Sequence, residues 1–323
     1  MKPLWKDMLT AIFMGMILPG ILLNAAAVLL DSKDSAPQET IPKETAPETV
    51  PLTMRLRVSD GTTEEMDMDT YLVGVVLAEM PASFESEALK AQSVVARTYT
   101  RKAYETGGKH GDGSVCANSA CCQAYISPDS YLSKGGTQEG LDKIRAAVAE
   151  TSGFVLTYGD ELIEATYFSC SGGSTEDAAA VWGTDFPYLQ AVASPGEENA
   201  AHYTDTVTFT PQQFQTALGT ALPGTPKSWF GTTTYTEGGG IATMMIGGEA
   251  YTGTQLRSLL NLRSTAFTVS ATEDTITITT KGYGHRVGMS QYGADAMAVA
   301  GSTYAEILSY YYQGTTLTRL TQS

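Results

Sequence analysis

The chain has 323 residues, of which 42% are hydrophobic, and this excludes a protein that is disordered throughout. Its 35 acidic and 20 basic residues give a formal net charge of -15. This charge argues against a nucleic-acid partner, because a protein that neutralises phosphates needs a basic surface. Four cysteines are too few to build a disulfide scaffold of this length.

Residues 8–30 form an apolar segment of 23 residues without a formal charge. As a helix it would measure about 34 Å, enough for a hydrocarbon core of roughly 30 Å. Lys2 and Lys6 precede it, so the positive-inside rule puts the N-terminus in the cytoplasm and the rest of the chain outside. We therefore expect residues 1–31 to form a cytoplasmic tip and a single transmembrane anchor. The alternative is a cleaved signal peptide with the small residues 24–27 as its site.

Residues 32–51 contain recurring prolines among Glu, Thr, Ser and Lys, a composition that cannot bury a core. This segment is predicted to be a disordered linker that tends to extended conformations. At about 3 Å per residue it would reach on the order of 60 Å from the membrane. That reach suits a partner in the cell wall, and residues 52–323 are expected to form the folded domain.

A helix is predicted from about residue 70 to Pro81, with Asp69 as its N-cap and apolar residues at helical spacing. Glu79 falls in its last turn. The negative end of the helix dipole and the apolar neighbours both disfavour an ionised carboxylate there. Since a general acid must be protonated near neutral pH, Glu79 is the candidate catalytic acid.

A second helix is predicted over residues 83–104. Its small and apolar residues share one face, which is expected to contact the core. Lys90, Arg97, Arg101 and Tyr104 share the opposite face and form a basic stripe. The stripe is either an ordinary solvated surface or a set of hydrogen-bonding groups for a ligand.

The other predicted elements alternate irregularly between strands and helices, without a βαβ rhythm or an internal repeat. Residues 107–135 are loop-like. The predicted elements are a strand at 52–58, a helix at 141–151, a hairpin of 154–158 with 161–169, a helix opening at Pro211, strands within 232–251, a helix at 253–262, two strands within 267–280 and helices at 291–299 and 304–312. We therefore predict an α+β fold in which helices and short antiparallel strands form a cleft.

His110, Cys116 and Cys122 are spaced by six residues in both steps and supply one imidazole and two thiolates, which are ligands that zinc prefers. The spacing is not that of a zinc finger. A fourth ligand must then come from elsewhere, for example from water or a carboxylate. A disulfide between Cys116 and Cys121 or Cys122 is an alternative outside the cytoplasm, and free thiols are a third possibility.

Residues 282–293, GYGHRVGMSQYG, combine four glycines with polar side chains. So many glycines indicate a loop whose backbone approaches a ligand closely. The segment is not a phosphate loop, because no GKS or GKT follows. His285 is either a satisfied structural histidine or a residue at the substrate.

The chain contains the motifs LAEMP, EALKAQSVVARTY, YFSCSGG, VWG, PYLQAV, GHRVGMSQYGADAMA and ILSYYYQGT between residues 55 and 315. Together they resemble the stage II sporulation protein D family, which includes the amidase enhancer domain. The resemblance implies a membrane-anchored peptidoglycan lytic transglycosylase of endospore-forming bacteria, acting in engulfment of the forespore. It implies that the partners are glycan strands, an amidase that removes stem peptides and a membrane scaffold protein. The implied location is the mother-cell membrane, with the catalytic domain facing the forespore.

By motif, Glu79 matches the catalytic glutamate of the family, and Lys90 and Arg97 match its supporting polar residues. The spacing of His110, Cys116 and Cys122 resembles the zinc-binding set of clostridial members. The expected substrate-binding residues within these motifs are Gln92, Ser169, Gly172, His285 and Gln291.

A hydrolytic glycosidase usually needs two carboxylates, one as acid and one as base or nucleophile. A lytic transglycosylase can use one, because the 6-hydroxyl of the same muramic acid is the nucleophile. Glu79 would protonate the glycosidic oxygen and then take the proton from O6, leaving a 1,6-anhydro end. A non-enzymatic wall-binding scaffold that stimulates an amidase is the main alternative, and a zinc hydrolase is the third.

Overall fold

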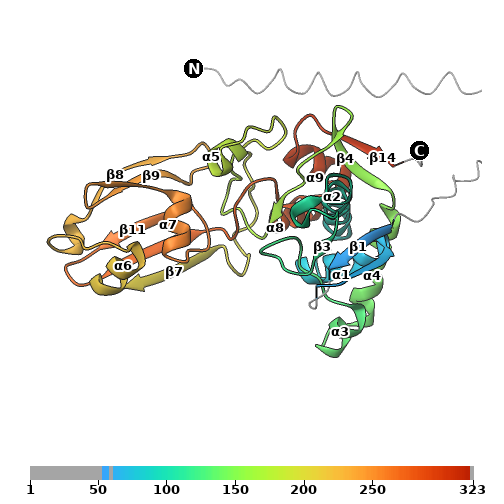
Figure 1. Cartoon of the computed structure of the whole chain (residues 1–323), viewed down its shortest axis with the longest axis horizontal. Helices are drawn as coiled ribbons and strands as arrows, with labels where there is room; N and C mark the ends of the chain where they lie inside the picture. The colour runs from blue at the N-terminus through green and yellow to red at the C-terminus, as the bar shows by residue number, and fades with distance from the viewer. Residues whose placement is uncertain (1–52, 58–60, 321–323) are drawn as a thin grey trace, which may run out of the picture. The chain divides into compact units, whose positions relative to one another are not determined.

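The computed structural model describes residues 53–57 and 61–320 (Figure 1). The anchor expected at 1–31 and the linker expected at 32–51 lie outside these residues. Within the described ranges, no helix combines the length and apolarity needed to cross a membrane. Helices and short strands are mixed along the chain, so the predicted α+β class is confirmed.

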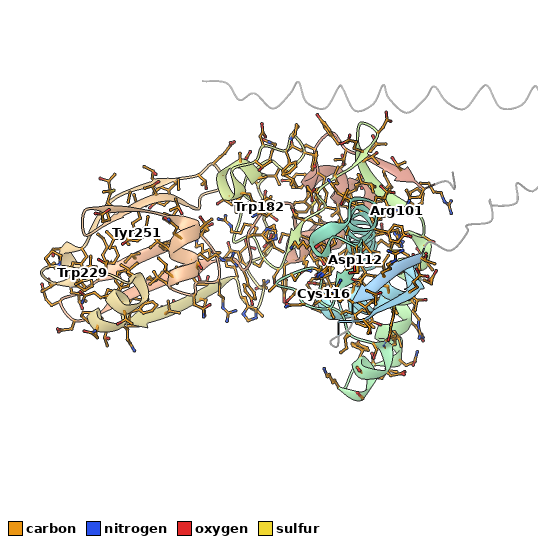
Figure 2. All side chains as sticks on the ribbon, viewed as in Figure 1. Arg101, Asp112, Cys116, Trp182, Trp229 and Tyr251 are labelled. Atoms are coloured by element: carbon orange, nitrogen blue, oxygen red, sulfur yellow. The ribbon has the colours of Figure 1, made fainter. Side chains whose placement is uncertain are left out.

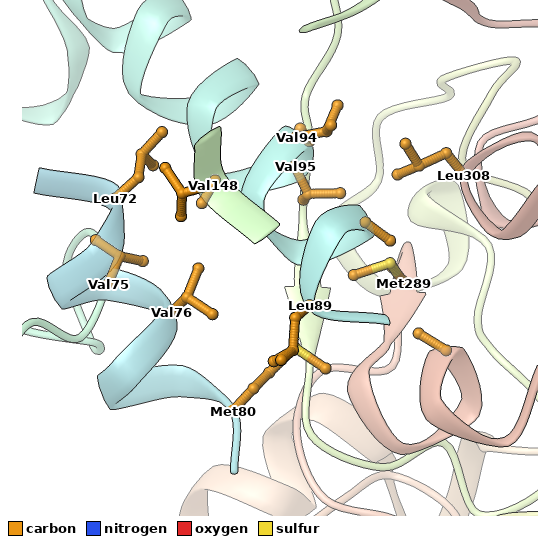
Figure 3. Close-up of a cluster of buried hydrophobic side chains, with 14 of the residues drawn as sticks. Leu72, Val75, Val76, Met80, Leu89, Val94, Val95, Val148, Met289 and Leu308 are labelled. Carbon is orange, nitrogen blue, oxygen red and sulfur yellow. The ribbon is translucent and has the colours of Figure 1, made fainter. Parts of the chain in front are cut away.

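The larger of two hydrophobic cores is built around helix α2 (Ser86–Thr106). The elements that pack against α2 are α1 (Met68–Glu79), α4 (Gln138–Glu150), α8 (Gln291–Val299), α9 (Tyr304–Tyr311) and β4 (Phe154–Tyr158). Figure 3 shows apolar side chains of this core meeting around α2, among them Leu72, Val76, Leu89, Val95 and Leu308. Because other elements enclose α2, nearly every residue from Ala88 to Thr98 is buried.

The predicted division of α2 into an apolar and a basic face is therefore wrong for Arg97, whose side chain is fully buried. The helix also begins at Ser86 and not at residue 83. Helix α1 begins two residues before the predicted start, because the side chain of Asp67, and not that of Asp69, accepts a hydrogen bond from the amide of Thr70 and caps the helix. It ends at Glu79, as the sequence predicted, with Met80 extended before Pro81.

Three small sheets accompany the larger core. They are β2 (Thr63–Asp67), β1 (Thr53–Arg57) and β3 (Val115–Cys116); β14 (Thr316–Arg319), β4 and β5 (Glu161–Leu162); and β13 (Met289–Ser290) with β6 (Tyr167–Phe168). The β1–β3 and β13–β6 pairings are parallel, so the expectation of antiparallel strands is wrong for these two. The crossover between β1 and β3 is supplied by α1 and α2, since parallel strands need a long connection.

The second core lies between residues 204 and 281. One of its sheets contains β11 (Phe267–Ala271), β12 (Ile276–Lys281) and β7 (Thr204–Phe209), and the other contains β10 (Glu249–Thr252), β9 (Ile241–Ile246) and β8 (Phe230–Tyr235). Helices α6 (Pro211–Leu218) and α7 (Gly253–Leu259) complete it, each begun by a threonine capping box. Phe214, Trp229 and Leu256 are buried in this core.

Two helices were not predicted from the sequence: α3 (Pro128–Ser133), within the supposed loop, and α5 (Ala178–Trp182). Both are short. Each begins at a residue whose side chain caps it, Ser127 for α3 and Asp177 for α5, and such caps are hard to recognise without a long apolar repeat after them. Helix α4 starts at Gln138, three residues before the predicted start, because Thr137 caps it.

Candidate active site and metal centre

Glu79 is the last residue of α1, and its carboxylate lies close to polar groups from distant parts of the chain. Its Oε1 accepts the backbone amide of Ala124 at 2.7 Å. The Tyr167 hydroxyl and the Gln291 side chain also lie close enough to favour its charged form. Burial has the larger effect and raises the pKa of Glu79 above its ordinary value of 4.5. All three groups are neutral, so the site holds a carboxyl that binds its proton more tightly than an exposed glutamate does.

The segment that carries Ala124 lies directly against α1. The amide of Ile126 donates to the carbonyl of Gly74 at 3.1 Å. A Cβ on Gly74 would lie 2.3 Å from the ring of Tyr125, so only glycine allows this approach. The absence of a side chain in mid-helix therefore brings the Ala124 amide to Glu79.

Gln123 fixes the same segment from the other side. Its Nε2 donates to Thr100 Oγ1 at 2.9 Å and to the Tyr71 hydroxyl at 3.4 Å, and its Oε1 accepts the Tyr167 hydroxyl at 3.2 Å. Gln123 is buried, with 1% of its surface exposed. One buried amide thus connects α1, α2 and the tyrosine that faces Glu79.

The parallel pairing of β6 with β13 brings the other two groups to the site. Tyr167 is in register with Met289, and Phe168 with Ser290. Ser290 caps α8, so Gln291 follows directly as its first residue. Ser169 contributes through its carbonyl, which accepts the Tyr292 amide at 3.1 Å and ties the two motifs together.

His110, Cys116, Cys121 and Cys122 form a cluster next to this segment, in the region of Cys116 in Figure 2. One potential ligand atom from each lies within 4.8 Å of the others. His110 Nε2 is 3.8 Å from Cys121 Sγ and 3.6 Å from Cys122 Sγ, and the two sulfurs are 3.8 Å apart. All four cysteines of the chain are free thiols, which excludes the disulfide alternative in this structure.

The cluster has the dimensions of a tetrahedral zinc shell. Zn–S bonds of about 2.3 Å and Zn–N bonds of about 2.0–2.1 Å give edges of about 3.8 Å between sulfurs and about 3.6 Å between sulfur and nitrogen. The Cys121–Cys122 and Cys122–His110 distances match these edges, and the Cys121–His110 distance of 3.8 Å is slightly longer. The residues therefore fit zinc, with Cys121 in the position for which the sequence suggested water or a carboxylate.

Arg97 is placed away from Glu79. Arg97 pairs with Asp69 near the start of α1, at 2.9 Å, and donates to the carbonyls of Val148, Thr151 and Phe154. Because Glu79 is ten residues further along α1, these groups are about 15 Å apart along the helix axis.

Lys90 makes ion pairs with Glu87 at 2.8 Å and with Glu150 at 2.6 Å. Glu87 in turn accepts the amide of Tyr304 at the start of α9. In this structure Lys90 connects three helices, and the geometry gives it, like Arg97, a role in holding the elements around α2.

The expected substrate-binding residues fall into two groups. Gln92 and Gln291 are buried, and within the described ranges neither amide atom of Gln92 has a hydrogen-bond partner. The Nε2 of Gln291 lies close enough to Glu79 to lower the pKa of its carboxyl, but it makes no hydrogen bond of normal geometry to any described residue. Gln92 is fully enclosed, whereas Gln291 adjoins Glu79, so of the two only Gln291 is placed beside the proposed acid. Gly172 has a φ of 76°, and a Cβ there would lie 2.7 Å from the backbone of Lys281, so its role is to let two loops meet.

Both ring nitrogens of His285 are used within the protein. Nδ1 accepts the Val287 amide at 3.1 Å, and the ring faces the Tyr167 carbonyl. Burial and the charges of Arg257 and Lys109 lower its pKa to about 4, so the imidazole is neutral at pH 7. The His285 side chain is thus held in place beside Tyr167, and its ring contacts the rings of Phe168 and Trp182.

Three groups at these sites were not selected from the sequence: Tyr167, Cys121 and the Ala124 amide. Tyr167 opens the quoted motif YFSCSGG, and Cys121 adjoins a selected ligand, so both carried a signal. A backbone amide has none, because every residue type except proline supplies one.

Comparison with known proteins agrees with the sequence motifs. The family model described as stage II sporulation protein matches residues 59–158, a segment that contains Glu79 and the cluster of His110 with three cysteines. The chain is 42% identical over 264 residues to stage II sporulation protein D of Bacillus subtilis (strain 168), covering 80% of this chain and 76% of that protein. It is 40% identical over 263 residues to the protein of the same name from Bacillus amyloliquefaciens, with the same 80% and 76% coverage.

A more distant similarity is to the amidase enhancer of Bacillus subtilis (strain 168), at 31% identity over 306 residues, covering 76% of this chain and 40% of that protein. The matches to the two sporulation proteins extend over most of both chains, so they are not limited to a shared motif. The chain therefore belongs to the stage II sporulation protein D family.

Proposed function

We propose that this chain is a peptidoglycan lytic transglycosylase, in which Glu79 acts first as general acid and then as general base. The observation that carries the proposal is the environment of Glu79: the side chain is partly buried, its carboxyl accepts the Ala124 amide, and its pKa is raised with only neutral groups acting against the rise. The groups that set its pKa in the described part of the chain include no second carboxylate. A single protonated glutamate suits a reaction in which the substrate provides its own nucleophile.

The proposed reaction uses Glu79 twice. Its proton goes to the glycosidic oxygen between MurNAc and GlcNAc while positive charge develops at C1 of the muramic acid. The carboxylate that results is stabilised by the Ala124 amide, Tyr167 and Gln291, since each of these favours the charged form. Glu79 then takes the proton from O6 as O6 bonds to C1, and this restores the acid and leaves a 1,6-anhydro end.

The proposed substrate is glycan whose stem peptides have been removed, and the proposed setting is engulfment of the forespore during sporulation. Membership of the sporulation protein family supports this setting. The partners would be a sporulation amidase and a membrane scaffold protein of the engulfment machinery. The domain of residues 52–323 would lie outside the mother-cell membrane, on a single-pass anchor, facing the forespore.

We also propose that His110, Cys116, Cys121 and Cys122 hold zinc, as in the clostridial subtype of the family. Four protein ligands complete a tetrahedral shell, so zinc would supply a structural cross-link and no activated water. The cross-linked segment ends two residues before Ala124, whose amide binds Glu79. The metal would thus hold the donor segment against α1 and would take no part in bond cleavage, which disfavours the zinc hydrolase.

Mass spectrometry of glycan chain ends tests the proposal. The purified full chain is incubated with denuded strands and, separately, with strands that retain their peptides. New 1,6-anhydroMurNAc ends from the denuded strands are expected, and none from the Glu79→Gln variant. Reducing ends in place of anhydro ends would identify a hydrolase.

The similarity to an amidase enhancer favours one alternative, a wall-binding scaffold that stimulates an N-acetylmuramoyl-L-alanine amidase. The same incubation separates the two functions when amidase is added. Stimulated peptide release without any new chain ends would support the scaffold and contradict the transglycosylase.

A further inference from the structure

A group of aromatic and cationic side chains surrounds His285, next to the proposed acid. Trp182 lies 5.3 Å from the His285 ring between centroids, and 43% of Trp182 is exposed (Figure 2). Tyr283 is 38% exposed and lies under the guanidinium of Arg263 at 4.9 Å. Two exposed aromatic rings on a rigid support are suited to stacking against sugar rings.

Tyr167 connects this group to the proposed catalytic centre. Its backbone carbonyl faces the His285 ring, and its side chain reaches Glu79. Tyr167 therefore lies between the Trp182 and His285 rings on one side and the Glu79 carboxyl on the other. A glycan strand bound at Glu79 would extend to the Trp182 and His285 rings, since the sugars of one strand are directly linked.

Arg257, in the last turn of α7, differs from the two fully buried arginines, Arg97 and Arg286. Arg97 and Arg286 have carboxylate partners, Asp69 at 2.9 Å and Glu176 at 2.9 Å. Arg257 is half-buried and has no ion pair with any described residue, and its Nε has no hydrogen-bond partner there. In a chain with a formal charge of -15, a partly desolvated guanidinium without an acid is a site for an external anion.

The backbone places Arg257 beside the same loop. Leu262 donates to the Arg257 carbonyl at 2.9 Å, and Gly284 donates to the Arg263 carbonyl at 3.0 Å. The turn after α7 is thus bonded to the segment that carries Tyr283 and His285. The charge of Arg257 also lowers the pKa of the His285 imidazole.

We propose that Trp182 and Arg257 form a glycan subsite adjoining Glu79, in which Trp182 stacks on a sugar ring and Arg257 pairs with the lactyl carboxylate of a peptide-free muramic acid. This inference rests on the proposed function. Stem peptides are joined to muramic acid through an amide of the lactyl group. Removal of the peptide by an amidase frees that carboxylate, so a guanidinium in the subsite distinguishes denuded from peptide-bearing strands.

The test measures binding and does not depend on cleavage. The Glu79→Gln full chain is titrated with soluble denuded strands, and with the same strands after their lactyl carboxylates have been converted to neutral methylamides. We expect roughly tenfold tighter binding of the free carboxylates, from one charge-assisted pair. Adding Arg257→Gln should abolish this preference. Adding Trp182→Ala should weaken both ligands by a similar factor.

Arg319→Gln is the matched control, since Arg319 is exposed, stacks on Phe154 and makes no ion pair with any described residue. It should leave the preference unchanged, and thermal unfolding checks that each variant is folded. A preference that survives Arg257→Gln would overturn the inference, as would equal binding of both strands by the parent. If the preference is present but the wild type makes no anhydro ends, the proposed function fails and the subsite stands.

Discussion

The two ends of helix α1 carry carboxylates in opposite settings. Asp69, near the start, faces a fully buried guanidinium, with 2.9 Å between its Oδ1 and the Nη2 of Arg97. Glu79, at the end, accepts the amide of Ala124, and the other described groups that lower its pKa, Tyr167 and Gln291, are also neutral. The helix dipole adds to the contrast, because it favours an anion at the start of a helix and disfavours one at the end. The neighbouring charge, more than the residue type, makes Asp69 a structural anion and Glu79 a candidate acid.

The largest effect on this contrast should come from Glu79→Gln, which removes the transferable proton and keeps the shape of the side chain. We expect cleavage of denuded glycan to fall by at least about 10³-fold, because general acid–base catalysis contributes roughly 10²–10⁴-fold. Glu65→Gln, on the exposed strand β2, is the matched control and should retain full activity. Measured turnover in Glu79→Gln close to that of the control would contradict the assignment of Glu79 as the acid.

Arg97→Met tests the other end of the helix. It leaves Asp69 unpaired and removes the donors to the carbonyls of Val148 and Thr151. Arg97 is fully buried and Asp69 is 32% exposed, so breaking this partly buried pair should lower the free energy of unfolding by about 2–3 kcal/mol, below the roughly 3–5 kcal/mol of a fully buried one. Denaturant unfolding measures it.

Arg145→Met is the control for that experiment, since Arg145 is half-exposed and pairs with Asp142 on the surface of α4. A change within about 0.5 kcal/mol is expected for it. If Arg97→Met were as mild as the control, and glycan cleavage were lost without any loss of stability, Arg97 would act at the substrate and the structural assignment would be wrong.

Loss of the proposed zinc should affect the surroundings of Glu79 and leave those of Asp69 unchanged. Cys121→Ser should lower zinc affinity by more than about tenfold, because a thiolate ligand is lost, whereas Cys170→Ser, outside the cluster, should leave zinc stoichiometry unchanged. Chelation should also speed hydrogen exchange of the Ala124 amide. Unchanged zinc affinity in Cys121→Ser would show that the fourth ligand lies elsewhere.

Lys90→Met should destabilise the protein much less than Arg97→Met. Its partners Glu87 and Glu150 are 31% and 58% exposed, so solvent screens the two ion pairs. We expect a loss of about 1 kcal/mol in the free energy of unfolding and an unchanged pH profile of cleavage. A shifted pH profile would instead place Lys90 near the acid.

The sequence alone was sufficient to predict most elements and the position of Glu79. Helical periodicity followed by Pro81 fixed the end of α1, and the threonine at 210 before Pro211 marked the start of α6. Periodicity failed for α2, because a helix enclosed on all sides has no solvent face for Arg97 to occupy. The sequence pattern of α2 alone does not show that other elements cover the face on which Arg97 lies.

The groups around Glu79 were beyond sequence reasoning for a different reason. Tyr167 and Gln291 are more than 100 positions apart and meet only through a parallel pairing of two-residue strands. Such short strands leave no alternation to recognise. The position of the Ala124 amide depends on Gly74, because a side chain at residue 74 would collide with the ring of Tyr125.

Titration of the Glu79 carboxyl by carbon-13 NMR, assigned with Glu79→Gln, tests the central claim most directly. Because burial raises the folded-state pKa above 4.5, Glu79 should bind its proton at pH values where an exposed glutamate has lost it. As the pH rises through that pKa, the wild type should lose stability relative to Glu79→Gln, and cleavage should decline. A midpoint above 4.5 is predicted, and a midpoint at or below 4.5 would contradict the assignment of Glu79 as the acid.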